Sequence, residues 1–207
     1  MDNITDDGTP LAASPLTRAV LEIDEYAAGL GWDQPARLFA LVDTDRLRTE
    51  EPVLADRLGL GGGSGGGDGQ DDPAGRDGGS GAAPAALTPV EQDELPAGVP
   101  LDEFLGTIAW PDAVAGCAMT VERLMLPPSA ETSVPRELQE EGAEERLARW
   151  VAEHPERREV RMTVAVLRDG ARETALRLRE KDSPTEVLTG PDLVPGLAEA
   201  LAGTFAD

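Results

Sequence analysis

Residues 159–180 read EVRMTVAVLRDGARETALRLRE, and this stretch decides the fold. Apolar and polar side chains alternate on both sides of an Asp-Gly pair, which is the pattern of two antiparallel strands joined by a tight turn. A two-residue turn would set Val164 opposite Ala175 and waste the apolar face of the hairpin. A three-residue loop with Gly170 in the left-handed conformation sets Val164 opposite Thr174 and aligns the apolar faces, so we predict this register.

The same register places two like charges against each other. Arg161 lies directly opposite Arg177, and residues 157–181 are basic overall although the chain has a formal net charge of −22. Like charges in such a cross-strand pair repel by a few tenths to about 1 kcal/mol. Either acidic side chains from elsewhere in the chain neutralise the pair, or the two guanidinium groups form a groove for a carboxylate-bearing ligand or an acidic protein partner.

A second long strand is predicted over residues 115–126, AGCAMTVERLML. Side chains alternate across a strand, so Cys117, Met119 and Val121 share one side and Glu122 lies on the other. The length and the apolar side indicate a central strand of the same sheet.

The rest of the chain predicts helices and one further strand. Ser14 can cap a helix that has Pro15 at its first position, and Leu16, Val20, Ile23 and Ala27 recur on one face of this helix. The remaining expected elements are a strand over 37–43 and helices over 45–50, 101–105, 143–154 and 191–205. This order predicts an α+β fold: a mostly antiparallel sheet with helices packed on one face, interrupted by a disordered Gly-rich tether.

Composition divides the chain into a domain and two polar segments. Residues 59–86 are rich in Gly, Ser and Asp, cannot bury enough apolar surface to offset their ordering entropy, and are predicted to be a flexible linker. Residues 1–13 are predicted to be a disordered tail. Residues 14–58 and 87–207 are expected to form a single α+β domain across the linker.

The net charge and the number of cysteines limit the possible binding partners and the cellular compartment of the protein. A formal net charge of −22 opposes affinity for nucleic acid, which depends on Lys and Arg displacing counterions. The single cysteine, the absence of a signal-peptide pattern and the absence of a long apolar run predict a cytoplasmic protein without direct membrane insertion. Ala, Gly, Arg and Pro are abundant, which suits a genome rich in G and C.

Residues 110–123 match two short sequence motifs of tyrosine phosphatases. Trp110-Pro111-Asp112 matches the acid loop of that class, and Cys117 and Arg123 have the Cys-x5-Arg spacing of its phosphate loop. A phosphate loop must curl so that its backbone N–H groups converge on the anion. The intervening residues contain no glycine and favour a strand, in which the two side chains would be roughly 20 Å apart. We therefore predict that Cys117 is a small buried side chain.

No other constellation indicates chemistry. His154, the only histidine, precedes a proline at a predicted helix end, where a helix dipole and free carbonyls explain it. Close pairs of acids are expected by chance among 40 acidic residues, and none lies in a calcium-loop pattern. We therefore assign no catalytic, cofactor-binding or metal-binding residue and expect no cofactor.

The chain nevertheless resembles a known family. The run 109–118 (AWPDAVAGCA), the segments 121–123 (VER) and 126–128 (LPP), the helix start at 14–16 (SPL) and the hairpin 161–179 resemble a family of uncharacterised proteins from actinobacteria. The resemblance covers most of the chain outside residues 59–86. It implies an actinobacterial, cytoplasmic setting and no particular activity, cofactor or catalytic residue.

Three classes of function remain, and the first is preferred. The first is a non-catalytic cytosolic binding or accessory protein that engages another protein, with Trp110, Arg161 and Arg177 as partner-binding residues. Exposed Trp is common at interaction sites, and the hairpin that carries the two arginines is basic. The second is a small enzyme acting on an anionic metabolite near the two arginines. The third is a structural subunit of a larger assembly. The oligomeric state is left open.

Overall fold

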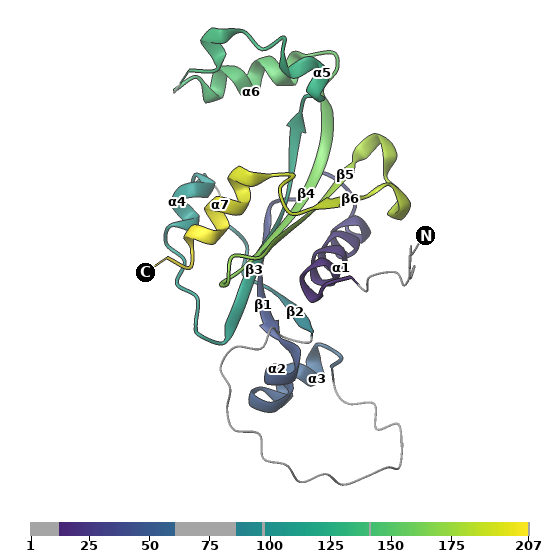
Figure 1. Cartoon of the computed structure of the whole chain (residues 1–207), viewed down its shortest axis with the longest axis vertical. Coiled ribbons are helices and arrows are strands. Elements are labelled where there is room, and N and C mark those ends of the chain that lie inside the picture. The colour runs from purple at the N-terminus through teal and green to yellow at the C-terminus, as the bar shows by residue number, and fades with distance from the viewer. Residues whose placement is uncertain (1–12, 61–85, 97, 141, 207) are drawn as a thin grey trace, which may run out of the picture.

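The computed structural model describes residues 13–60, 86–96, 98–140 and 142–206. Almost all of the predicted tail and of the predicted linker lies outside these residues. The described chain is built around a six-stranded sheet in the order β2-β1-β3-β4-β5-β6, with every neighbouring pair antiparallel (Figure 1). The strands are β1 (Arg37–Asp43), β2 (Leu87–Glu91), β3 (Val114–Met125), β4 (Arg158–Leu167), β5 (Arg172–Leu178) and β6 (Leu188–Gly190).

The β4–β5 hairpin has the predicted register. Val164 lies opposite Thr174, and the Leu167 amide donates to the Ala171 carbonyl at 2.8 Å. Gly170 has a φ of +90°, in the left-handed region that favours glycine. The three-residue loop and the cross-strand pairing of the two arginines are therefore confirmed.

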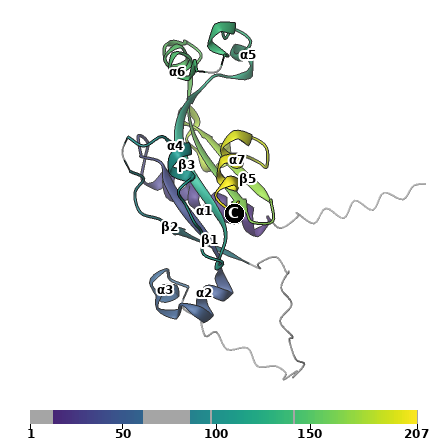
Figure 2. The same cartoon turned by 90° about the vertical axis from the view of Figure 1, so that its left-hand side faces the viewer.

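The α+β class is confirmed, but the expectation that the helices pack on one face is corrected. The helices are α1 (Pro15–Gly29), α2 (Thr44–Glu50), α3 (Pro52–Arg57), α4 (Leu101–Leu105), α5 (Pro128–Glu131), α6 (Glu144–Glu153) and α7 (Pro195–Gly203). Helix α1 packs on one face of the sheet, whereas α4 and α7 pack on the other (Figures 1 and 2). Central strands of this sheet carry apolar side chains on both faces, so each face needs a cover.

The two cores differ in side-chain size. Under α1, three neighbouring strands present Ala118, Ala165 and Ala175, and these small side chains let Val20 and Ile23 of the helix approach the sheet closely. On the other face the larger Cys117, Met119, Val164 and Val166 pack against Leu201 of α7 and its neighbours. Helix α1 begins as predicted, with the Ser14 hydroxyl accepting from the Thr17 amide at 3.0 Å.

The two middle strands extend beyond the rest of the sheet. Helices α5 and α6 lie past the ends of β3 and β4, and α2 and α3 lie at the opposite end of the sheet (Figure 1). The last helix begins at Pro195 rather than at 191, because residues 188–190 form the edge strand β6 and the backbone of Val194, with φ −137° and ψ 70°, is not yet helical. Strands β2 and β6 and the short helices α3 and α5 were not predicted.

Candidate functional site

Arg161 lies at the centre of a polar cluster between the sheet and the loop that follows α1. The residue is only 1% exposed. Its Nη2 donates to Oε1 of Glu122 at 2.8 Å and also to the Gly31 carbonyl. Glu122 lies directly opposite Arg161 in the β3–β4 register, so the strand pairing itself brings the two charges together.

Arg177, the cross-strand neighbour of Arg161, has acids of its own. It is 4% exposed, and its Nε and Nη2 donate to Oδ2 of Asp24 at 3.1 and 2.5 Å. Its Nη1 donates to Oδ1 of Asp182 at 3.3 Å. Burial alone would lower the pKa of Arg177, but the hydrogen bonds and charge of Asp24 raise it overall. The guanidinium therefore stays charged in the core because α1 delivers a carboxylate to it.

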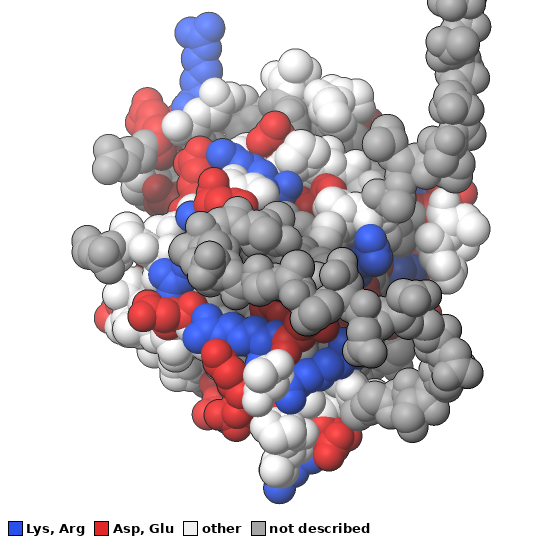
Figure 3. Space-filling view, turned by 60° about the horizontal axis from the view of Figure 1, so that its bottom comes forward, with Lys and Arg blue, Asp and Glu red and all other residues white. Residues whose placement is uncertain are grey.

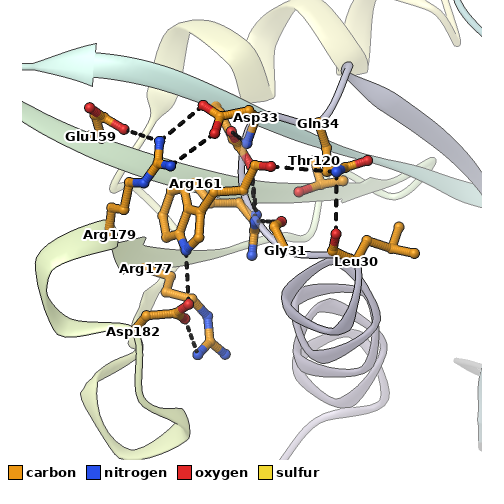
Figure 4. A network of polar contacts seen from close by, with 12 residues as sticks. Leu30, Gly31, Asp33, Gln34, Thr120, Glu159, Arg161, Arg177, Arg179 and Asp182 are labelled. Atoms are coloured by element: carbon orange, nitrogen blue, oxygen red, sulfur yellow. Dashed lines mark hydrogen bonds and ion pairs between the residues drawn. The ribbon is translucent and has the colours of Figure 1, made fainter.

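Trp32 closes this cluster. Its ring centroid lies 4.4 Å from the Arg161 guanidinium carbon and 5.6 Å from that of Arg179, so two cations contact one indole. Its Nε1 donates to Oδ2 of Asp182 at 2.8 Å. The next residue, Asp33, has a φ of +66°, and its carboxylate accepts from Nη1 and Nη2 of Arg179 at 2.9 and 2.8 Å (Figure 4). These hydrogen bonds lower the pKa of the Asp33 carboxyl.

The cluster is largely satisfied by the chain itself. Acidic side chains pair with both arginines, which is the first of the two interpretations drawn from the sequence. Arg161 Nη1 and Arg37 Nε have no hydrogen-bond partner among the described residues, and both side chains border a cavity of about 10 Å³, a size that suits one water molecule. Partner binding by Arg161 and Arg177 stays a prediction, and in this arrangement neither side chain reaches the surface.

Trp110 lies on the other side of the sheet. Its Nε1 donates to Oγ1 of Thr204 at 2.9 Å, and its ring stacks on Phe205 with centroids 6.2 Å apart. The Arg168 guanidinium lies over Phe205 and donates to the Trp110 carbonyl at 3.0 Å. Half-buried Trp110 therefore joins the start of β3 to the C-terminal end of α7. The structure does not bring it together with the two buried arginines.

The lone thiol is buried within a strand. Cys117 lies in the middle of β3, and burial raises the pKa of its thiol to about 12. Arg123 lies six residues further along the same strand and is exposed. The Cys-x5-Arg spacing therefore forms no phosphate-binding loop, as the sequence predicted.

His154 contacts residues near it in sequence and Ser133, whose hydroxyl oxygen lies 3.5 Å from its Nε2. It follows α6, its Nδ1 accepts from the Glu156 amide at 3.2 Å, and its ring lies 4.9 Å from that of Trp150. Within the described residues, no three His, Cys, Asp or Glu side chains lie close enough together to hold a metal ion. In the same part of the chain, no helix is both long enough and apolar enough to cross a bilayer.

The surface between α1 and the edge strand β2 has a different character. A hollow of about 230 Å³, which we call the α1–β2 hollow, opens there. Its apolar walls are Ile23, Tyr26, Phe39, Leu58 and Pro89. Tyr26 packs edge-to-face on Phe39 with ring centroids 6.3 Å apart, and Tyr26 and Leu58 are 44% and 38% exposed. Large apolar side chains left in contact with water along one hollow are typical of a binding surface.

Two carboxylates border the α1–β2 hollow, and they differ in their partners. Glu91 accepts from the Tyr26 hydroxyl at 2.8 Å and pairs with Arg37. The hydrogen bond to Glu91 raises the pKa of the Tyr26 hydroxyl. Glu22 has no ion-pair or hydrogen-bond partner within the described chain, and partial burial raises the pKa of its carboxyl.

Other surface hollows are less distinctive. One of about 300 Å³ beside Trp32 and Arg179 is lined mostly by charged side chains that already pair. An apolar one of about 170 Å³ lies beneath Leu188 of β6, and its single charged neighbour, Arg158, pairs with Glu180. On the face in Figure 3, blue Lys and Arg side chains lie beside red Asp and Glu side chains. The prediction that nucleic acid is not a partner stays a prediction.

Sequence reasoning missed both the α1–β2 hollow and the acid that neutralises Arg177. Asp24 follows Leu16 and Val20 in steps of four, so helical periodicity by itself places it on the buried face of α1. No sequence pattern predicted the role of Trp32, because its partners are distant in the chain. They are Arg161 of β4, Arg179 of the 3₁₀ turn Arg179–Lys181, and Asp182 after that turn.

The described residues define an α+β protein with an antiparallel six-stranded sheet, buried and internally paired charges, and an apolar surface hollow bordered by acids. A sequence profile of the family described as PPA1309-like protein matches residues 16–206, and the chain belongs to this family. No curated protein and no solved structure matches the chain. The resemblance to a family without an assigned function is thus supported.

Proposed function

We propose that this protein is a non-catalytic binding or accessory protein that engages another protein through the α1–β2 hollow. The observation that carries the proposal is the exposed apolar wall of Tyr26 and Leu58 on the surface between a helix and an edge strand. Burying one such side chain against a partner contributes roughly 1.5–3 kcal/mol. By contrast, the side chains best suited to catalysis or anion binding are not free for either role. Cys117 is buried and protonated, and Arg161 and Arg177 are paired with acids.

The cellular location and the origin of the protein are part of the same proposal. We infer a cytoplasmic location, because a single buried cysteine suits a reducing compartment. An actinobacterial origin is supported by the composition rich in Ala, Gly, Arg and Pro.

The two other classes of function have less support. An enzyme acting on an anionic metabolite would need a free guanidinium, and Glu122 and Asp24 already occupy those of Arg161 and Arg177. A structural subunit of a larger assembly would use an apolar surface permanently, and it would remain in a stable complex during size-exclusion chromatography of a native lysate.

The experiment compares two surface variants of the full chain. Leu58→Ser removes part of the apolar wall, whereas Val53→Ser removes a 67% exposed side chain of α3 that does not border the hollow. Affinity capture from a native lysate, followed by calorimetry with the purified captured protein, should show a partner that the wild type and Val53→Ser bind alike. Leu58→Ser should weaken its Kd by roughly tenfold or more. Equal affinity of the two variants would contradict the proposal.

A further inference from the structure

Glu22 is the carboxylate at the α1–β2 hollow that indicates which kind of side chain a partner would place there. The other carboxylates near the sheet side of α1 are paired: Asp24 with Arg177, and Glu91 with Arg37 and Tyr26. Glu22 borders the same hollow as Glu91 and has no partner within the described chain.

Glu22 is exposed, and it borders the apolar walls of the hollow. Partial burial against these walls disfavours the ionised form of its carboxyl and raises its pKa. Arg18, one helical turn earlier, does not compensate, since its Nε donates to the Ala13 carbonyl at 2.9 Å. A cation brought into the hollow would relieve this penalty, so the carboxylate favours a positively charged occupant.

The apolar walls favour a cation that has a long aliphatic stem. Lys and Arg side chains lay their methylene groups along apolar surface while the charged end stays near water or an acid. Tyr26 and Leu58 offer such a surface beside Glu22, and a tyrosine ring also attracts a cation over its face. A purely apolar side chain would fill the walls and leave the carboxylate unpaired.

The charge of the whole chain selects among occupants. A formal net charge of −22 steers basic partners toward the protein and opposes the docking of a second copy. Helix α1 contributes to this field, because Glu22 and Glu25 are acidic and Arg18 is its only basic residue.

We propose that the α1–β2 hollow binds a basic segment of the partner protein, with one Lys or Arg side chain lying across Tyr26 and Leu58 and its charged end on Glu22. The inference rests on the proposed function, and it names the partner's chemistry. The hollow is open between α1 and β2, so a segment lying along the helix can place one side chain in it and leave its neighbours over the acidic surface.

The test uses a short labelled peptide in which Lys alternates with Leu, titrated by fluorescence anisotropy against the full chain at physiological salt. Glu22→Gln removes the charge that borders the hollow, and Glu25→Gln removes the same charge from the same helix away from the hollow. We expect Glu22→Gln to weaken peptide binding about three- to tenfold and Glu25→Gln to change it less than about twofold. A matched peptide with Gln in place of Lys should bind the wild type and Glu22→Gln alike.

Equal weakening by the two variants would overturn the inference, because the peptide would then sense only the overall negative charge. No binding of the peptide to the wild type would overturn it as well. A concentration-dependent dimer of the wild type that Leu58→Ser abolishes would show that a second copy occupies the hollow, and this too would refute a basic partner. Thermal unfolding of Glu22→Gln at or above the wild-type midpoint shows that the fold is intact.

The outcomes also separate this inference from the proposed function. If Leu58→Ser weakens capture of the partner but Glu22→Gln matches Glu25→Gln, the hollow binds a partner without a basic contact, and only the inference fails. If Leu58→Ser behaves like Val53→Ser, the hollow is not the binding surface and both fail.

Discussion

Replacing Asp24 with Asn tests the buried charges on which the packing of α1 depends. Asp24 is 1% exposed, and its Oδ2 accepts hydrogen bonds from Nε and Nη2 of Arg177 at 3.1 and 2.5 Å. The substitution keeps the size and one carbonyl acceptor and removes the negative charge. Arg177 is then left in the core without its main counter-charge, and breaking a buried pair in this way costs about 3–5 kcal/mol. Asp182, 3.3 Å from Arg177 Nη1, remains as a weaker and more exposed partner, so we expect a loss of about 3 kcal/mol.

Urea unfolding of the full chain, followed by circular dichroism, measures this loss as a shift of the midpoint at constant slope. Two controls make it specific. Asp182→Asn removes the exposed partner of the same guanidinium and should cost less than about 1 kcal/mol. The double variant Asp24→Leu with Arg177→Met removes both buried charges, and it should be more stable than Asp24→Asn alone.

A loss below about 1 kcal/mol for Asp24→Asn would refute the reasoning, since it would mean that the buried guanidinium does not need its acid. A double variant less stable than Asp24→Asn would refute it in a second way. It would show that the packing of the two side chains, rather than their charges, holds α1 on the sheet.

Two further predictions concern β3. Gly116→Ala should destabilise the protein by about 3 kcal/mol or more in the same unfolding assay, because the added Cβ would lie 2.4 Å from the Val166 carbonyl oxygen. The matched control is Gly196→Ala, whose added Cβ would have nothing within 4 Å, and it should cost less than about 0.5 kcal/mol. Cys117 should not react with Ellman's reagent at pH 8 in the folded protein and should react fully in urea, because burial raises its thiol pKa to about 12 and the thiol therefore stays protonated. Rapid labelling of the native protein would contradict the second prediction, and a Gly116→Ala protein as stable as the wild type would contradict the first.

The strands that the sequence predicted are those with two buried faces or with apolar and polar side chains that alternate over many residues. The β4–β5 register followed from matching apolar faces and from Gly170, and both are local. Strand β2 was missed because it is short and contains Pro89, which cannot donate to a strand ladder and so weakens the pattern. Strand β6 was missed because three residues cannot show a period.

The candidate site was less predictable than the fold. The sequence showed that Arg161 and Arg177 lie opposite each other and that an acid or an anionic ligand had to neutralise them. It could not show which, since Asp24 and Glu122 come from other elements. The α1–β2 hollow was not predicted, because its walls come from residues far apart in the chain.

The amino-acid order determined on its own where the long strands and the first helix run, how the hairpin is registered, and that the lone cysteine lies extended within a strand. These properties depend on side-chain periodicity, turn chemistry and capping, which act between residues close in sequence. Only the tertiary structure decided that helices cover both faces of the sheet, that α1 supplies the carboxylate for Arg177, and that Glu22 stays unpaired beside an apolar hollow. Those outcomes depend on which distant elements share a face, and the free energy of packing, rather than local pattern, selects among the possible arrangements.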